Sequence, residues 1–292
     1  KNTGTIQSWN TDEHSLISQG LQPNYWRAPN DNDFGNKMPD RMAVWRRAGK
    51  DVQITSVDWI KINEYQVDVS GGQSYPETGA SGSTIYSING NGSVRTKHDL
   101  NPGSKELPNL PRFGMVMELP GNLDNMAWFG RGPHESYWDR KAGARVDLYQ
   151  GKVGDQYHPY VRPQENGNKT DVRWAAFTDD EGFGLMVVGD SLSINASHFR
   201  PEDYDNGEFD SAYVSATNNI RTKKQQRHTI DMVPRDLVNL HIDFKQMGLG
   251  GEDSWGSKPL PYHELPAKQY SYEFTLKPIM PNQNLIELSK RR

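Results

Sequence analysis

The chain has 292 residues, and 33 Lys and Arg against 37 Asp and Glu give a net charge of −4 at pH 7. This balance lacks the basic footprint of a nucleic-acid-binding protein, and no apolar run approaches the roughly 20 residues of a membrane-spanning helix. Cysteine is absent, which excludes disulfides and thiolate chemistry. The 8 Trp, 13 Tyr and 9 Phe predict a folded core, because each aromatic side chain buries a large apolar area.

Stretches in which apolar and polar residues alternate recur along the chain and predict β-strands in both halves. In chain order, these stretches are residues 52–60, 65–69, 113–119, 144–149, 238–244 and 270–276. Clusters of Gly, Asn, Asp and Pro predict tight turns between strands, at residues 89–92, 120–122, 179–182 and 206–207. The alternation in 238–244 is strict, so this strand is predicted to bury one face and expose the other.

Only one helix is predicted, a short one in which Asp40 caps the start and Gly49 ends the last turn. Residues 71–82, which are rich in Gly and Ser, are predicted to form a long mobile loop. No repeat and no linker-like composition divides the chain. The sequence therefore predicts an all-β fold in one domain, residues 1–292, built as an antiparallel two-sheet sandwich of many strands.

Hydrolysis of a glycoside requires two carboxylates about 5–10 Å apart, and three candidates lie in loops rich in Gly and aromatic residues. These are Glu135, Glu165 and Asp253. For each, a structural interpretation is favoured, in which the carboxylate caps loop amides or pairs with an arginine. We assign no catalytic residue to this chain.

The eight histidines form no closely spaced ligand pair, so no metal ion is predicted. His241 and Asp243 lie on the polar face of the predicted strand 238–244, where solvated or hydrogen-bonding side chains are the ordinary outcome. The sequence also lacks a Gly-x-Ser-x-Gly motif, a phosphate-binding loop and a dinucleotide fingerprint in a strand-turn-helix setting. No cofactor is therefore expected.

The segment 247–256 (MGLGGEDSWG) follows the clearest predicted strand. Three of its glycines fall within four residues and require a tight backbone path, which other residues follow only with strain. Trp255, near the end of this loop, has two interpretations. It is either a buried anchor of the loop or a platform for a sugar ring, because an indole matches the flat C–H face of a pyranose.

Four separated segments carry a resemblance to a known family. They are residues 25–35 (YWRAPNDNDFG), 128–140 (WFGRGPHESYWDR), 160–167 (YVRPQENG) and 248–255 (GLGGEDSW). In sequence, order and spacing they resemble the C-terminal domain of family 2 glycoside hydrolases of the β-galactosidase type, called the small chain where that enzyme is split. Because the strand expected before Lys1 is missing, we expect an excised fragment of a longer protein with an exposed sheet edge.

The resemblance implies a galactose mutarotase-like supersandwich that carries no catalytic residue of its own. In this family the catalytic glutamates belong to a separate (β/α)8 barrel of a retaining β-galactosidase. The expected partners are therefore that barrel and a β-galactoside substrate, with no nucleic acid and no membrane. The C-terminal domain supplies a wall of the active-site cleft, and the resemblance assigns neither cofactor nor metal to this fragment.

By the same resemblance, Trp255 stacks on the sugar or aglycone in the outer part of the site. Four neighbouring residues are expected to support it: Gly250 and Gly251 by letting the loop turn, and Asp253 and Ser254 by side-chain to backbone hydrogen bonds. Glu252 departs from the family pattern, which often has Asp there, and its longer side chain is expected to shift the loop.

Arg27, Asp31 and Asp33 are expected near the same cleft or at an interface, where they would make charge-assisted contacts. An internal salt-bridged turn is an equal alternative for these residues. Two other functions stay open, an autonomous carbohydrate-binding module on a concave sheet and an aldose mutarotase with a His and Glu acid–base pair. A homo-oligomer of the parent is compatible with the sequence, and the compartment, cytoplasmic or periplasmic, is left open.

Overall fold

The fold is described from a computed structural model, for residues 4–11, 14–205, 209–214, 221–223, 228–252 and 256–290. The strands are β1 (Asn10–Thr11), β2 (His14–Ser15), β3 (Gln19–Asn24), β4 (Gln53–Asn63), β5 (Gln66–Tyr75), β6 (Ala80–Asn89), β7 (Val94–Asn101), β8 (Arg112–Pro120), β9 (Asn125–Gly132), β10 (Arg145–Lys152), β11 (Lys169–Thr178), β12 (Gly184–Ser197), β13 (Phe209–Val214), β14 (Arg221–Lys223), β15 (Leu237–Gln246) and β16 (Tyr270–Ile279). The helices are all short: α1 (Asp31–Gly35), α2 (Met38–Arg41), α3 (Pro201–Tyr204) and α4 (Leu285–Lys290), with 3-10 turns η1 (Ala43–Trp45), η2 (Gly154–Gln156), η3 (Thr229–Asp231) and η4 (Pro261–His263).

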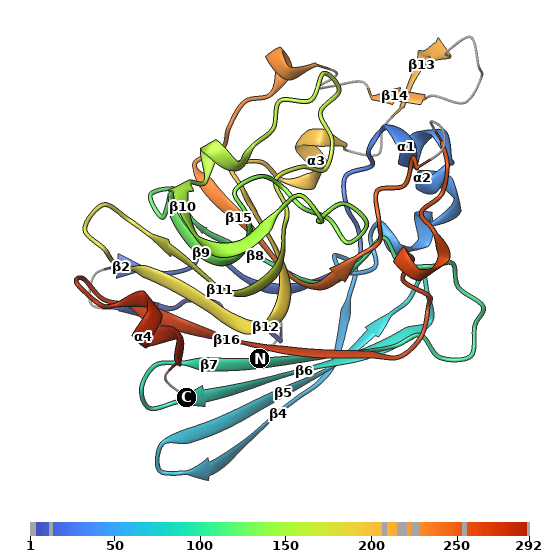
Figure 1. The fold of residues 1–292 in the computed structure, drawn as a ribbon. Coiled ribbons are helices and arrows are strands. Elements are labelled where there is room, and N and C mark those ends of the chain that lie inside the picture. Colours follow the sequence, from blue (N-terminus) through green and yellow to red (C-terminus); the bar gives the residue numbers. More distant parts are fainter. Residues whose placement is uncertain are drawn as a thin grey trace.

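Twelve of the strands form one connected antiparallel sheet (Figure 1). Its hydrogen-bonded order is β10-β9-β11-β12-β16-β7-β6-β5-β4, and a branch of β15, β8 and β3 starts from β12. The branch arises because β12 is 14 residues long. Its first part, 184–189, pairs with β16, and its last part, 193–197, pairs with β15. The expected all-β, antiparallel fold class is confirmed, and its two layers are joined through β12.

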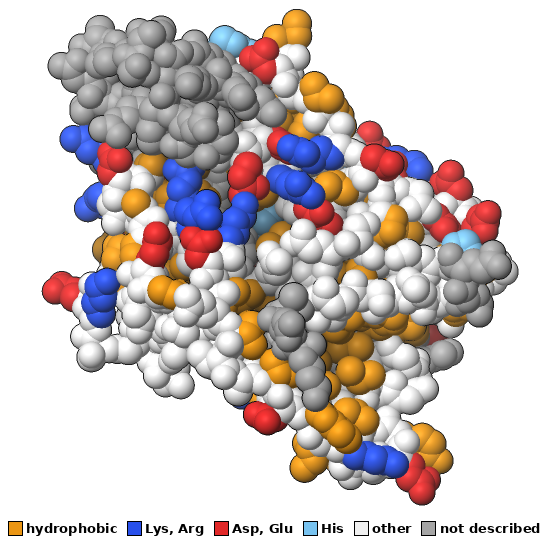
Figure 2. Space-filling model, turned by 180° about the vertical axis from the view of Figure 1, so that it is seen from behind, with side chains coloured by type: hydrophobic (Ala, Val, Ile, Leu, Met, Phe, Trp, Pro, Cys, Tyr) orange, Lys and Arg blue, Asp and Glu red, His pale blue; other side chains and the backbone are white. Residues whose placement is uncertain are grey.

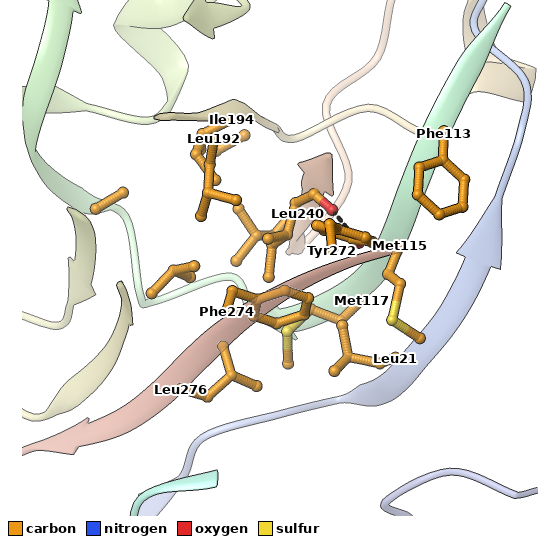
Figure 3. Close-up of a cluster of buried hydrophobic side chains, with 14 of the residues drawn as sticks. Leu21, Phe113, Met115, Met117, Leu192, Ile194, Leu240, Tyr272, Phe274 and Leu276 are labelled. Carbon is orange, nitrogen blue, oxygen red and sulfur yellow. Dashed lines mark hydrogen bonds between the residues drawn. The ribbon is translucent and has the colours of Figure 1, made fainter. Parts of the chain in front are cut away.

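The main hydrophobic core lies where the branch faces β16 (Figure 3). Met117 of β8, Leu240 of β15 and Phe274 of β16 are each at most 2% exposed. Burying side chains of this size contributes roughly 1.5–3 kcal/mol each. Tyr272 adds a cross-layer hydrogen bond, because its hydroxyl donates to the carbonyl oxygen of Ile242 over 2.7 Å. The core thereby fixes β8 and β15, whose ends carry residues of the site described below.

Strand β15 is buried on both faces, whereas the sequence predicted one exposed face. Its polar residues Asn239, His241 and Asp243 are at most 4% exposed. A guanidinium replaces water on this face, since Arg112 lies 3.1 Å from His241 Nδ1 and 3.0 Å from Asp243 Oδ2. Alternation therefore identified the strand but could not distinguish solvent from a buried polar layer.

The prediction of a mobile loop at 71–82 is wrong, because this segment forms the end of β5, the turn and the start of β6. The glycines permit close packing rather than mobility: a Cβ at Gly82 would lie 2.7 Å from the carbonyl oxygen of Asp99. The polar side chains satisfy one another, as when Gln73 Nε2 donates to Thr84 Oγ1 over 3.1 Å. Composition alone suggested a loop, but pairing with β4 and β7 overrides weak strand propensity.

The predicted helix between Asp40 and Gly49 is present only in part. The structure contains α2 and η1 instead, and Asp40 lies inside α2, whose N-cap is Lys37. Trp45 is fully buried and its indole nitrogen donates to the carbonyl oxygen of Pro108 over 2.9 Å, so tertiary packing decides the local backbone. No helix in the described parts of the chain is long and apolar enough to cross a membrane.

Candidate functional site

The buried side chain of Arg27 joins the segment 25–35 to the start of the glycine-rich loop. Its guanidinium makes two parallel hydrogen bonds to Asp33, of 3.1 and 2.9 Å, and both side chains are fully buried. The same guanidinium donates to the carbonyl oxygens of Met247 (2.6 Å) and Gly248 (2.9 Å). Arg27 and Asp33 thus form an internal ion pair, and the two bonds of Arg27 to carbonyl oxygens position the start of the loop backbone.

Helix α1 presents its first turn to two other loops. Asn30 caps the helix through a reciprocal pair of bonds with Asp33. Asp31 Oδ2 accepts from Gln164 Nε2 over 3.1 Å, and Asn32 Nδ2 donates to the carbonyl oxygen of Gly250 over 3.2 Å. The short helix therefore contacts both the 160–167 segment and the glycine-rich loop.

In the described part of the glycine-rich loop, the backbone turns at Gly250 and Gly251, as the sequence predicts. Gly250 and Gly251 have φ values of +73° and +85°, a region that L side chains enter only with strain. The Gly250 amide donates to Asp139 Oδ2 over 2.9 Å, and a Cβ at Gly251 would lie 2.5 Å from Asn32 Nδ2. The three expected residues that follow Glu252, namely Asp253, Ser254 and Trp255, lie outside the described residues.

A cavity of about 380 Å³ lies where the four segments meet. Its walls come from residues 30–32, from Asp139 and Arg140, from Tyr160, Gln164 and Glu165, and from residues 249–252. These segments are more than 200 residues apart at their extremes, and β8, β15 and the Arg27 contacts bring them together. The described walls mix apolar surface with polar side chains and carry both signs of charge.

The two candidate carboxylates that the structure describes are both held by the protein. Glu135 Oε2 accepts from the Gly167 amide over 2.8 Å, and its other oxygen pairs with Arg140. Glu165 pairs with the buried Arg112 over 3.0 Å. These are the contacts expected of carboxylates that cap a loop amide or pair with an arginine. The third candidate, Asp253, lies outside the described residues.

Behind the cavity, Arg112 is the centre of a buried ionic network. It contacts Glu165, Asp243 and the neutral ring of His241. Burial, opposed by Arg112 and reinforced by the charge of Glu165, raises the pKa of Asp243 to about 8. Burial, with the charge of Arg112, lowers the pKa of His241 well below its ordinary value. Burial thus favours the protonated form of Asp243 beside the ion pair of Arg112 and Glu165.

One cluster near the cavity combines side chains that bind metal ions in other proteins. Asp139, Glu252 and His263 place potential ligand atoms within 4.8 Å of one another. The sequence analysis predicted no metal, because these residues are too far apart in the chain to show a ligand spacing. Asp139 already accepts a hydrogen bond from Gly250, and Glu252 is exposed, so the cluster by itself assigns no ion.

The sequence analysis expected Arg27, Asp31 and Asp33 near the cleft or at an interface, or in an internal salt-bridged turn. It missed the residues that connect the segments. Gln164 and Asn32 were not singled out, although both lie inside the quoted motifs and Asn/Gln side chains offer a donor and an acceptor together. Arg112 lies outside all four motifs and gave no local signal. Its role depends on contacts across β8, β15 and the 160–167 segment.

Comparisons with known proteins give a consistent result. A family model described as beta galactosidase small chain matches residues 1–276. The chain is 36% identical to a beta-galactosidase of Priestia megaterium over 96% of its length, and 31% identical to one of Lactobacillus delbrueckii subsp. bulgaricus over 84%. It spans 25% and 22% of those proteins, so it corresponds to about a quarter of the curated relatives it matches.

Solved structures show only weak likeness. The galactose 1-epimerase of Lactobacillus acidophilus aligns with a TM-score of 0.39 and 9% identity, over 76% of this chain and 66% of that one. A likeness of this size carries no argument, so the fold described above rests on the chain's own strands.

Proposed function

Because the chain belongs to the beta-galactosidase small-chain family, we propose that it is the non-catalytic C-terminal part of a retaining family 2 β-galactosidase. In this proposal it completes the outer, aglycone side of the sugar site, whose catalytic glutamates lie on a separate barrel of the same polypeptide. The parent hydrolyses terminal β-D-galactosides. The length of the relatives supports this, since the chain covers 25% of the Priestia megaterium beta-galactosidase.

The observation that carries the proposal is the convergence of the four motif segments on one cavity. Arg27, Asn32 and Asp139 each make a hydrogen bond to the backbone of the glycine-rich loop. The loop backbone is thus held up to Gly250, five positions before Trp255 in the sequence. An anchored loop that ends in an indole is suited to place an aromatic face against a sugar ring.

The contacts of the two described candidate carboxylates support a site shared with another domain. Glu135 and Glu165 are both engaged by backbone or arginine. A nucleophile and an acid would need pKa values that differ and an open path to one glycosidic bond. We place these groups in the barrel.

A face suited to docking on the rest of the polypeptide lies at the β4–β5 hairpin. Trp59, Ile60, Ile62 and Tyr65 are between 50% and 74% exposed, and Figure 2 shows hydrophobic side chains gathered at the projecting end of the molecule. Apolar groups of this size are seldom left in water by a complete protein. In the proposal this face packs against other parts of the parent enzyme.

The test is made in the complete enzyme. Trp255→Ala should lower kcat/KM for lactose by about tenfold or more and weaken acceptor inhibition, because a lost sugar contact of ~1.4 kcal/mol is a factor of ten. Trp255→Phe should retain most of the activity, since it keeps an aromatic face. Tyr262→Ala, a change at an exposed aromatic residue outside the cavity walls, is the matched control. Unchanged kcat/KM and acceptor inhibition in Trp255→Ala would refute the subsite role.

A further inference from the structure

Three side chains from separate segments converge at the edge of the cavity. Asp139 lies between β9 and β10, Glu252 belongs to the glycine-rich loop, and His263 is the last residue of η4. One potential ligand atom from each residue lies within 4.8 Å of the other two. Asp139 and Glu252 are walls of the cavity. Apart from the hydrogen bond between Asp139 and Gly250, the proposed function gives these groups no role.

Two of the three side chains each carry a buried atom that has no hydrogen-bond partner among the described residues. These atoms are Oδ1 of Asp139 and Nδ1 of His263. The other oxygen of Asp139, Oδ2, accepts from the Gly250 amide. A buried polar atom without a partner lowers stability, so two of them in one cluster indicate a group that contacts both.

Gly248 allows these two side chains to approach each other. A Cβ at Gly248 would lie 2.7 Å from Cγ of Asp139 and 3.1 Å from Cβ of His263. Oδ1 is bonded to the first of these atoms and Nδ1 is two bonds from the second, so both unpartnered atoms lie close to one point. His263 is also held in place, because its carbonyl oxygen accepts from the Gly248 amide over 2.8 Å and its ring lies edge-on to Trp138, with 5.6 Å between the ring centroids.

The charges of the cluster favour a positive ion as the missing group. Within the part of the chain that the structure describes, neither Asp139 nor Glu252 forms an ion pair. Arg140 is the only Lys or Arg among the described cavity walls, and it pairs with Glu135. Two carboxylates at this separation repel each other. A water molecule would serve the two unpartnered atoms but leave this repulsion, whereas a cation removes both costs.

The ligand types select the class of ion. One imidazole and two carboxylates suit transition-metal ions, whereas Mg²⁺ and Ca²⁺ prefer oxygen ligands alone. Such an ion lies about 2.0–2.2 Å from its ligands, and the exposed Glu252 side chain can move to close the remaining gap. We propose that Asp139, Glu252 and His263 bind a divalent transition-metal ion of the Zn²⁺ or Mn²⁺ type, which links the glycine-rich loop to η4. This proposal goes beyond the proposed function and does not depend on it.

The test counts the ions bound by the complete polypeptide. The protein is stripped with a chelator and dialysed to equilibrium against Zn²⁺, Mn²⁺ or Mg²⁺, and the metal content per chain is measured by mass spectrometry. Glu252→Gln and His263→Gln should each weaken one Zn²⁺ or Mn²⁺ site by at least tenfold, so that one ion fewer is bound per chain when that site is just saturated in the wild type. Zn²⁺ should bind this site more tightly than Mn²⁺.

Matched controls are Glu181→Gln and His134→Gln, which change exposed residues of the same types outside the cavity walls and should keep the wild-type count. Ions held elsewhere in the polypeptide cancel in the comparison with wild type, and the count of Mg²⁺ should not change in any variant. Glu252 is exposed, so its substitution tests the site without disturbing the core.

Three results would overturn the inference. Equal counts in the wild type, Glu252→Gln and His263→Gln would place every bound ion elsewhere. An equal loss in the two control variants would indicate surface binding only. A loss of Mg²⁺ as large as that of Zn²⁺ would contradict a role for the imidazole. Because the number of bound ions does not depend on hydrolysis, this outcome is distinguishable from that of the Trp255 experiment.

Discussion

The ion pair of Arg27 and Asp33 is the residue-scale feature on which the site depends. Removing one member of a fully buried pair leaves an uncompensated charge, which typically costs about 3–5 kcal/mol. Asp33→Asn should therefore lower the free energy of unfolding by that amount in denaturant titrations. The exposed pair of Arg47 and Asp51 gives the matched control, and Arg47→Met should leave the free energy of unfolding close to that of the wild type. A loss below 1 kcal/mol for Asp33→Asn would contradict the anchoring role.

His98 gives the protein a specific dependence on acid. It is fully buried, hydrogen-bonded to Tyr25 and Thr84, and burial lowers its pKa from 6.5 to about 4. Between these values the unfolded chain binds a proton that the folded protein does not. Stability from this residue is complete above pH 6.5 and is lost as the pH falls towards 4, by about 3 kcal/mol.

The variant His98→Gln separates this titration from packing. Its free energy of unfolding should be lower than that of the wild type near neutral pH, and the gap should narrow between pH 6.5 and 4. Denaturant titrations at four pH values measure this. A gap that stays constant over the whole range would show that His98 contributes only its packing and hydrogen bonds.

At the scale of elements, the glycine-rich loop makes the sharpest prediction. Gly251→Ala introduces both a strained φ and a Cβ only 2.5 Å from Asn32 Nδ2, so the loop must shift. Gly79→Ala has a comparable φ of +72° but meets no atom closer than 3.9 Å, and it controls for strain alone. In the complete enzyme, Gly251→Ala should lower kcat/KM for lactose by about tenfold, as displaced contact groups do, while Gly79→Ala leaves it unchanged. Equal activities would mean that the loop path is irrelevant to the site.

The sequence pattern predicted some strands correctly and missed others. Strict alternation identified β15 and β16, because a two-residue period leaves a clear signal. The hairpin at 71–82 was missed because its small and polar residues have weak strand propensity and depend on neighbouring strands. The exposed face predicted for β15 was wrong because Arg112, more than 100 residues away in the chain, covers it.

At the scale of the whole molecule, the four motif segments identified the family and the segments that meet at the site. The way they meet could not be predicted, because the contacts of Arg27 with Met247 and of Asp31 with Gln164 span long sequence separations. The exposure of the apolar hairpin face was equally invisible, because its residues lie close together at 59–65 but their contact with solvent is a property of the folded surface.

The central claim is that this chain supplies a wall of a β-galactosidase site without the catalytic groups. The most direct measurement is hydrolysis of o-nitrophenyl β-galactoside by the 292-residue chain alone, beside the complete enzyme as a positive control. The account predicts turnover by the complete enzyme and none by the chain. Turnover by the chain alone would contradict it, because a complete carboxylate pair would then lie within these residues.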